Sequence, residues 1–314
     1  MIYTLTTNPA IDMNLTGIDI KPNVVNRTKN TIYSPNGKGI NVTLTLQYFD
    51  VESKVLGFFG GFTGKYIIDE LSVRQVLSEP IWVDDITRIN VFVNDRDSEY
   101  KFVNSGAFVG RDKQKELLLL LNNLEDCTCL IISGSLPKGI NDNYYNEILE
   151  LLNDKKIPFV LDISSERLKD LLKYRPLLIK PNDEETKKIL GIEINTEYDV
   201  IKAMKLFKEC GAQNILLTMG DKGAYFFDGK NIFYSSIQKV KLISSACAGD
   251  AALGAFLSKW LNNNKNIEEA MKLSAATGAN VAESNALGTF SKVNEYKENI
   301  KVRLVKNLEV EGEF

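Results

Sequence analysis

A small-residue turn, Cys247 to Asp250, leads directly into an apolar helical pattern over residues 251–261. The free N–H groups at the start of such a helix form a site for an anion. A carboxylate at that position, Asp250, could take a proton from a hydroxyl group while the amides hold a phosphoryl group. Acidic residues are also common in the first turn of ordinary helices, because the helix dipole favours them there. The turn alone therefore allows a catalytic base or a simple helix-start acid.

The absence of histidine narrows the choice of catalytic base in this chain of 314 residues. Ser-His-Asp and Cys-His mechanisms are excluded, so a general base must be Asp, Glu, Lys, Tyr or Cys. The cysteines are sparse and lack the spacing of metal ligands, which excludes a Cys/His zinc site. They are Cys127, Cys129, Cys210 and Cys247. Free thiols in a reducing cytoplasm are the expected state.

The charge and the hydrophobic pattern limit the classes of partner. A net charge of −3 at pH 7 gives no reason to expect nucleic acid or an anionic membrane surface. The first residues lack the basic and apolar regions of a signal peptide. The longest leucine run, residues 117–121, is far too short to span a membrane. We therefore expect a cytoplasmic protein that acts on small molecules.

Four further polar segments lie at or near the ends of expected strands, where open α/β sheets bind their ligands. These segments are Asn8–Asp12, Asn36–Asn41, Lys180–Glu185 and Thr218–Gly223. The first is also typical of a turn, the third of a helix capping box and the fourth of a hairpin. The second places a lysine between two glycines, which suits a phosphate, but it matches no Walker loop. No Rossmann glycine motif follows the first strand, so dinucleotide binding has little support.

Strand and helix patterns alternate from residue 111 onward, which predicts a doubly wound, mostly parallel sheet with helices on both faces. Buried strands are expected over residues 2–7, 54–59, 129–133, 159–162, 177–180 and 214–218. Two other sections, 11–35 and 81–104, contain strand patterns that no helix interrupts, and we expect them to form a small antiparallel sheet. The core would then comprise residues 1–10, 36–80 and 105–314.

The order of the motifs resembles that of the phosphofructokinase-B branch of the ribokinase-like sugar kinases, over nearly the whole chain. The shared motifs are Asn-Pro-x-x-Asp from residue 8, Gly-Lys-Gly-x-Asn from 37, Ser-Gly-Ser-Leu-Pro at 133–137, Lys-Pro-Asn-x-x-Glu from 180, Thr-x-Gly-x-x-Gly from 218 and Ala-Gly-Asp from 248. Residues 57–64 and 87–91 further look like the 1-phosphofructokinase subgroup. Tagatose-6-phosphate kinases are the neighbouring alternative.

This resemblance implies transfer of the γ-phosphoryl group of MgATP to the 6-hydroxyl of fructose 1-phosphate, which gives fructose 1,6-bisphosphate. Asp250 would be the base, and the amides of Ala248, Gly249 and Asp250 would form the anion hole, with Cys247 in the same catalytic segment. Asn182 and Glu185 would organise Mg²⁺ through its waters. The residues implied to contact ATP are Lys180, Asn182, Thr218, Gly220 and Gly223.

The resemblance also implies a sugar-phosphate site and a lid. The residues implied to bind the substrate are Asp12, Arg27, Gly37, Lys38, Asn41, Arg88 and Asn90. Of these, the cations Arg27, Lys38 and Arg88 would grip the phosphate that the sugar already carries. Sections 11–35 and 81–104 would be a lid, which in this family often supplies a homodimer contact.

Three residues depart from the family pattern. Asn36 and Cys247 stand where glycine is usual, and Ala251 follows the aspartate where serine or threonine is common. The anion hole survives these changes because its donors are backbone amides. Two alternatives stay open: a kinase for tagatose 6-phosphate or another sugar, and a catalytically silent sensor of sugar phosphates.

Overall fold

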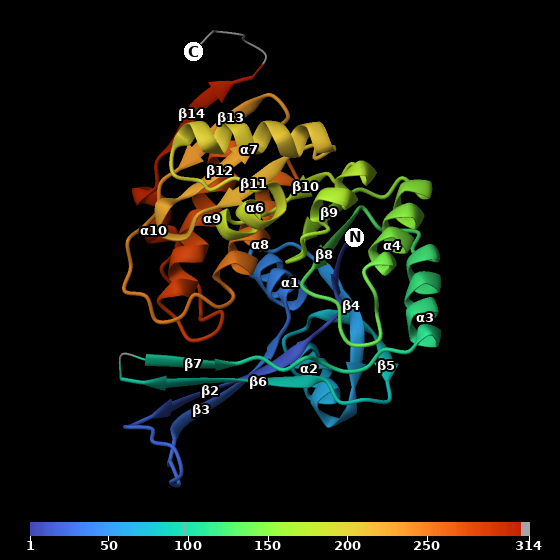
Figure 1. The fold of residues 1–314 in the computed structure, drawn as a ribbon, viewed down its shortest axis with the longest axis vertical. Coiled ribbons are helices and arrows are strands. Elements are labelled where there is room, and N and C mark those ends of the chain that lie inside the picture. Colours follow the sequence, from blue (N-terminus) through green and yellow to red (C-terminus); the bar gives the residue numbers. More distant parts are fainter. Residues whose placement is uncertain (97, 309–314) are drawn as a thin grey trace.

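Two β-sheets organise the computed structural model, which describes residues 1–96 and 98–308 (Figure 1). The strands of the large sheet are β1 Ile2–Thr6, β4 Ser53–Gly60, β5 Leu77–Val83, β8 Cys129–Ser133, β9 Phe159–Asp162, β10 Leu178–Ile179, β11 Ile215–Thr218, β12 Ala224–Phe227, β13 Asn231–Ser235 and β14 Val302–Asn307. The strands of the small sheet are β2 Ala10–Gly17, β3 Lys29–Asn36, β6 Arg88–Asp95 and β7 Ser98–Phe102.

The helices lie mainly between strands of the large sheet in the sequence. They are α1 Lys38–Tyr48, α2 Gly61–Val73, α3 Arg111–Asn122, α4 Asn143–Asp154, α5 Leu168–Leu171, α6 Asp183–Leu190, α7 Glu197–Cys210, α8 Ala248–Trp260, α9 Ile267–Ala282 and α10 Val293–Asn299. Two short 3₁₀ turns cover Leu172–Tyr174 and Gly220–Lys222.

The large sheet has the strand order β14-β13-β12-β11-β10-β9-β8-β1-β4-β5. All pairings from β11 through β5 are parallel, whereas β12, β13 and β14 pair antiparallel at the other edge. Parallel strands need crossover connections, and helices supply them here. The predicted α/β class with a doubly wound, mostly parallel sheet is therefore confirmed.

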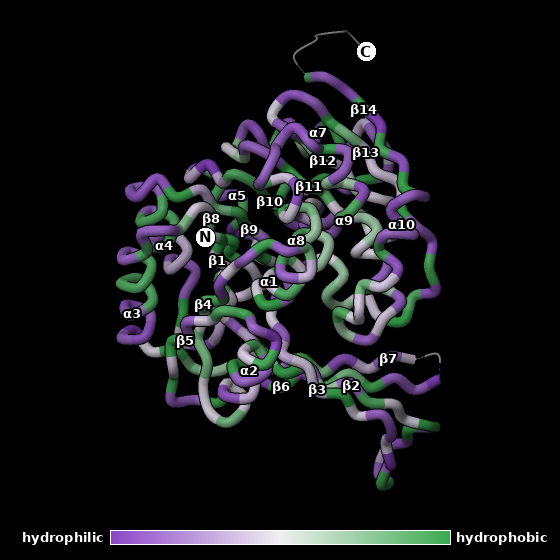
Figure 2. The backbone as a smooth tube through the Cα atoms, turned by 180° about the vertical axis from the view of Figure 1, so that it is seen from behind, coloured by the Kyte–Doolittle hydropathy of each residue, from purple (hydrophilic) through white to green (hydrophobic). Residues whose placement is uncertain are grey.

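Helices cover both faces of the large sheet, so its central strands are buried on both sides. In β1, Tyr3 and Leu5 pack in the core beneath α3, α4 and α7, whereas Ile2 packs in the core beneath α1, α8 and α9. Figure 2 shows hydrophobic stretches along the central strands and hydrophilic stretches on the outer helices. The carboxyl ends of β1, β9, β10 and β11 consequently meet at one edge, which positions the polar segments that follow them.

The small sheet lies apart from the large one in Figure 1 and has the order β3-β2-β6-β7. Its outer pairs are antiparallel, but β2 pairs parallel with β6. The prediction of a purely antiparallel sheet is wrong for this pair. It is also wrong for Ile81–Val83, which belong to β5 and pair parallel with β4 in the large sheet. The crossover helix α2 precedes β5, so this strand completes a β-α-β unit of the core.

Four segments connect the small sheet to the core: residues 7–9, Gly37, residues 84–87 and residues 103–110. Gly37 alone joins β3 to α1, and its φ of +149° lies in a region that favours glycine. No helix within the described residues is long and apolar enough to cross a membrane.

Candidate active site

Contacts between distant segments assemble the predicted site at the carboxyl edge of the parallel strands. Thr218, at the end of β11, donates its N–H to Pro181 O at 3.1 Å, so the segments after β10 and β11 lie side by side. Asn41, in α1, donates from Nδ2 to Asp250 Oδ2 at 2.9 Å, which brings the start of α8 to the start of α1. Each contact brings together two of the motifs whose placement at strand ends predicts that they lie close.

Asp250 is the third residue of α8 and is buried, with 8% of its surface exposed. Burial disfavours the charged carboxylate and raises the pKa of Asp250 to about 6. The charge of Lys38 opposes this rise, and the charge of Asp162 adds to it. A carboxylate with a pKa near 6 is ionised at neutral pH and still accepts protons readily, which suits a general base.

The turn before Asp250 forms an anion site from backbone groups. Helix α8 closes its first bond from Ala251 N–H to Cys247 O at 2.9 Å. The first amides of a helix have no partner within it and point outward along its axis. Lys180 Nζ lies beside this turn, since a β-carbon built on Gly249 would be 3.6 Å from it. Backbone amides and an ammonium group thus lie together at the start of α8, an arrangement that can bind an anion.

A buried carboxylate holds two of the predicted lysines together. Asp162, the last residue of β9, accepts ion pairs at Oδ1 from Lys180 Nζ at 3.1 Å and from Lys38 Nζ at 3.3 Å. Burial acts to raise the pKa of Asp162, but the two ammonium groups outweigh it and hold that pKa below its usual value. Asp162 Oδ2 is buried and has no hydrogen-bond partner.

Asp162 was not among the predicted site residues. The sequence feature that could have identified Asp162 is its position at the end of a buried strand, which was correctly expected over residues 159–162. Ser164, two residues further on, was also missed. Its Oγ donates to Glu185 Oε1 at 2.7 Å and lies 3.4 Å from Lys38 Nζ. These residues join the lysine pair to the segment that was predicted to organise Mg²⁺.

Asn182 and Glu185 form a capping box at the start of α6. Asn182 Oδ1 accepts from Glu185 N–H at 2.7 Å, and Glu185 Oε2 accepts from Asn182 N–H at 3.1 Å. Among the described residues, no group of three or more His, Cys, Asp and Glu side chains could hold a metal ion directly. Oxygen donors that reach an ion through water fit Mg²⁺, which keeps several waters and is completed by substrate phosphates.

Asp12, in β2, is the centre of the predicted sugar site. Its Oδ1 accepts from Asn90 Nδ2 at 2.8 Å, and its Oδ2 accepts from Asn36 Nδ2. Burial raises the pKa of Asp12 to about 6, against the opposing effect of these amides and of Arg88. Arg88 donates to the backbone oxygens of Asn8 at 3.0 Å and Asn104 at 2.8 Å, whereas its buried Nε has no partner.

The remaining predicted residues differ in how closely they approach this site. Gly220 and Gly223 bracket the 3₁₀ turn after β11, with φ values of +54° and +97° that favour glycine. Gly223 also packs against a neighbouring strand, because a β-carbon there would lie 2.4 Å from Ser235 O. Arg27 lies in the exposed loop between β2 and β3, and within the described residues no hydrogen bond or ion pair links it to the other site residues.

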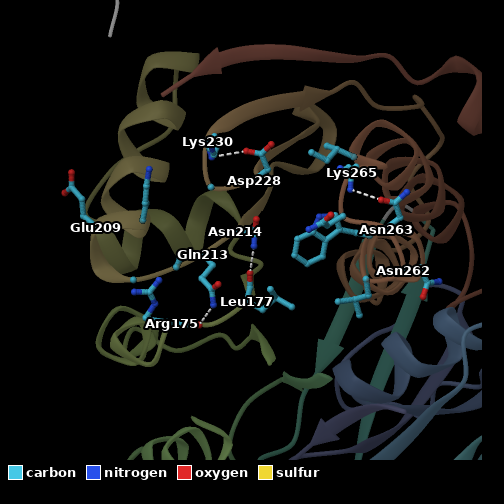
Figure 3. Close-up of a pocket in the computed structure, with 18 residues that line it drawn as sticks. Arg175, Leu177, Glu209, Gln213, Asn214, Asp228, Lys230, Asn262, Asn263 and Lys265 are labelled. Atoms are coloured by element: carbon cyan, nitrogen blue, oxygen red, sulfur yellow. Dashed lines mark hydrogen bonds between the residues drawn. The ribbon is translucent and has the colours of Figure 1, made fainter. Parts of the chain in front are cut away.

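A separate hollow of about 1400 Å³ lies at the opposite edge of the sheet, where β10 and β11 begin (Figure 3). Leu177, Asn214 and Trp260 line it, and Asn214 Nδ2 donates to Leu177 O at 2.7 Å. None of the predicted site residues borders it. Asp250 lies at the edge that carries the strand carboxyl ends and does not border this hollow.

Comparison with known proteins identifies relatives over almost the full chain. D-tagatose-1-phosphate kinase of Klebsiella oxytoca is 47% identical over 302 residues, which cover 96% of this chain and 99% of the relative. 1-Phosphofructokinase of Bacillus subtilis (strain 168) is 32% identical over 305 residues, which cover 96% and 99%.

A solved structure agrees with the fold as well as with the sequence. The tetrameric inhibited form of phosphofructokinase-2 from Escherichia coli superimposes with a TM-score of 0.85 at 27% identity, covering 95% of this chain and 99% of that one. The family model described as pfkB family carbohydrate kinase matches residues 6–293. This chain therefore belongs to the pfkB family of carbohydrate kinases.

Proposed function

We propose that this sugar-phosphate kinase transfers the γ-phosphoryl group of MgATP to the 6-hydroxyl of a ketohexose 1-phosphate, with tagatose 1-phosphate as the main acceptor. The observation that carries the proposal is Asp250, a buried carboxylate with a raised pKa at the amide-rich start of α8. The 47% identical relative named for tagatose 1-phosphate supports the choice of sugar. Tagatose 1-phosphate therefore replaces fructose 1-phosphate, which we expected from the sequence, as the first candidate for the acceptor.

Fructose 1-phosphate remains the second candidate because another relative is named for it. The two sugars are epimers at C4 and carry the phosphate and the 6-hydroxyl at the same ends. A site that holds the phosphate at one end and the base at the other can accept both. Discrimination between them would require contacts with the middle of the sugar.

The catalytic step follows from the positions of the charged groups. Asp250 would accept the proton of the 6-hydroxyl as that oxygen attacks the γ-phosphorus. The amides of Ala248, Gly249 and Asp250, together with Lys180, would stabilise the negative charge of the transferring group. Asn182 and Glu185 would hold Mg²⁺ through its waters. When bound, Mg²⁺ neutralises charge on the ATP phosphates.

The substrate phosphate would lie at the Arg88 end of the sugar site. The buried Nε of Arg88 has no protein partner, which supports a role as an anion ligand. Asp12 and Asn90 would bind sugar hydroxyls next to it. Lys38 Nζ pairs with Asp162 at 3.3 Å, so its ammonium would serve the reacting end and not, as we expected from the sequence, the substrate phosphate. Arg27 stays a proposed phosphate ligand.

We also propose that the small sheet acts as a lid and as the contact of a homodimer. Large apolar side chains are exposed on this sheet and on the segments next to its strands, and exposed apolar patches mark interaction surfaces. The exposed members are Ile18, Val24, Val25, Ile32, Tyr33, Tyr100, Phe102 and Val103. Pairing of two lids would cover this surface.

The test is an ADP-release assay at fixed MgATP with tagatose 1-phosphate, fructose 1-phosphate, tagatose 6-phosphate and the free sugars. We expect the two 1-phosphates to be turned over, with tagatose 1-phosphate preferred. Asp250→Asn is the control for contaminating kinases. Faster turnover of tagatose 6-phosphate, or of a free sugar, would refute the assignment.

A further inference from the structure

Asn36 and Cys247 touch each other in the sugar site although 211 positions separate them in the chain. Asn36 Nδ2 donates to Cys247 Sγ at 3.3 Å. Asn36 ends β3 in the small sheet, and Cys247 immediately precedes α8 in the core. The contact thus joins the lid to the turn that carries the catalytic base.

The backbone at Cys247 is in a conformation that favours glycine. Its φ of +64° lies in the left-handed region, where a β-carbon is strained against the backbone. Glycine would adopt this turn without that strain. A side chain is therefore held here at a cost in stability, and such strain is typical of functional sites.

The pair lies midway along a line of contacts from Asp12 to Asp250. Asn36 Nδ2 also donates to Asp12 Oδ2, and Asn36 Oδ1 accepts from Asn41 Nδ2 at 3.2 Å. Asn41 in turn donates to Asp250. These bonds use both amide hydrogens of Asn36, so its orientation is fixed. The second lone pair of Asn36 Oδ1 and the thiol group are what remain to face a ligand.

The thiol of Cys247 is a neutral group at this position. Burial raises its pKa well above the usual value, and the charges of Asp250 and Asp12 add to the rise. A thiolate nucleophile or metal ligand is thereby disfavoured. What Cys247 contributes is the volume of its sulfur and a weak S–H donor, both set between the two carboxylates.

We propose that Asn36 and Cys247 together read the configuration of the sugar at C4. This rests on the proposed function, in which the phosphate lies near Arg88 and the reacting hydroxyl at Asp250. The middle carbons of the substrate then face the pair, and C4 is the centre at which tagatose and fructose differ. A fixed amide and a sulfur atom would hydrogen-bond to the C4 hydroxyl in one configuration and clash with it in the other.

The experiment compares kcat/KM for tagatose 1-phosphate and fructose 1-phosphate in the wild type, Asn36→Gly, Cys247→Gly and the double variant. We expect each single change to alter the ratio between the two epimers by tenfold or more. The double variant should fall short of the product of the single effects, because the two side chains act as one unit. The KM for ATP should change less than twofold, and Cys127→Gly is the matched control away from the site.

The outcomes separate this proposal from the proposed function. If the wild type turns over neither 1-phosphate, both fail. If it turns over at least one and the epimer ratio stays constant in all variants, only the role of the pair is refuted. Thermal unfolding is an independent check on the strain at residue 247. Cys247→Gly should raise the Tm, and a lower Tm would contradict the argument from backbone strain.

Discussion

The hydrogen bond from Asn41 to Asp250 should set the pH at which the enzyme loses activity. As the proposed base, Asp250 must be ionised to accept a proton, so activity should be present above its pKa and fall as the pH drops through it. With a pKa of about 6 in the free protein, the wild type should lose half of its kcat/KM for the sugar phosphate near that pH. Asn41→Leu removes a donor that favours the charged form, so the pKa of Asp250 should rise further.

The size of this rise follows from the bond that is lost. A hydrogen bond to a charged group contributes roughly 1.5–3 kcal/mol, and one pKa unit corresponds to about 1.4 kcal/mol. The pKa of Asp250 should therefore rise by roughly one to two units, to about 7–8. At pH 7, about 90% of wild-type Asp250 is ionised, against roughly 10–50% in Asn41→Leu.

The assay is kcat/KM for the sugar phosphate from ADP release between pH 5 and 9 at fixed MgATP, because kcat/KM reports the ionisation of the free enzyme. Asn41 is also expected to contact the sugar, but loss of that contact would lower kcat/KM at every pH without moving the acid limb. The phosphate of the substrate titrates near pH 6 as well, but it does so equally in both enzymes. Thr43→Val, a buried neighbour in α1 that bonds to Thr4 instead, controls for disturbance of the helix. An acid limb at the same pH in wild type and Asn41→Leu would refute the reasoning.

Three further predictions test the other charged groups. Asp250→Asn should lower kcat by at least ~10²-fold, whereas ATP binding, measured by calorimetry, should persist. Near-wild-type turnover would exclude Asp250 as the base. Asp250→Asn should also have a higher Tm than the wild type at pH 8, because the raised pKa of Asp250 means that the folded wild type bears a destabilising buried charge there. This gain in Tm should vanish below about pH 4, where the carboxyl group is protonated in both the folded and the unfolded wild type. A gain that is independent of pH would contradict this prediction. Arg88→Ala should raise the KM for the sugar phosphate tenfold or more, about 1.4 kcal/mol, and leave the KM for ATP unchanged, whereas equal effects on both would argue against a phosphate site at Arg88.

The parallel core was predictable because its strands are short apolar runs with helical patterns between them. Residues 129–133 and 159–162 have the bounds expected from sequence. β13 and β14 were missed, since their pairing at the sheet edge leaves them partly exposed and the apolar pattern is weak. The last three residues of β5, Ile81–Val83, were assigned to the small sheet because strand patterns follow them directly. The parallel pairing of β5 with β4 is a tertiary contact that local sequence does not encode.

Site residues could be predicted where they belong to a sequence motif, and less well where only the tertiary structure brings them into the site. Asp250 and Asn41 lie in motifs, and the structure brings them within hydrogen-bonding distance. Asp162 follows an apolar strand without any motif, and its role depends on two lysines that approach from other segments. The contact between Asn36 and Cys247 could not be foreseen, because it joins segments that only the packing of the small sheet on the core brings together.

The four connections between the two sheets limit how the small sheet can move. A sheet tethered by one linker could take up many orientations, and closing it would cost much entropy. Four crossings at residues 7–9, Gly37, 84–87 and 103–110 must all bend together in any such motion, which restricts it far more than a single linker would. Asp12, Lys38 and Arg88 lie within a few residues of these crossings. If the small sheet is the lid that we propose, its closure would therefore also move the residues that we propose to bind the sugar phosphate, so that binding and closure would be coupled.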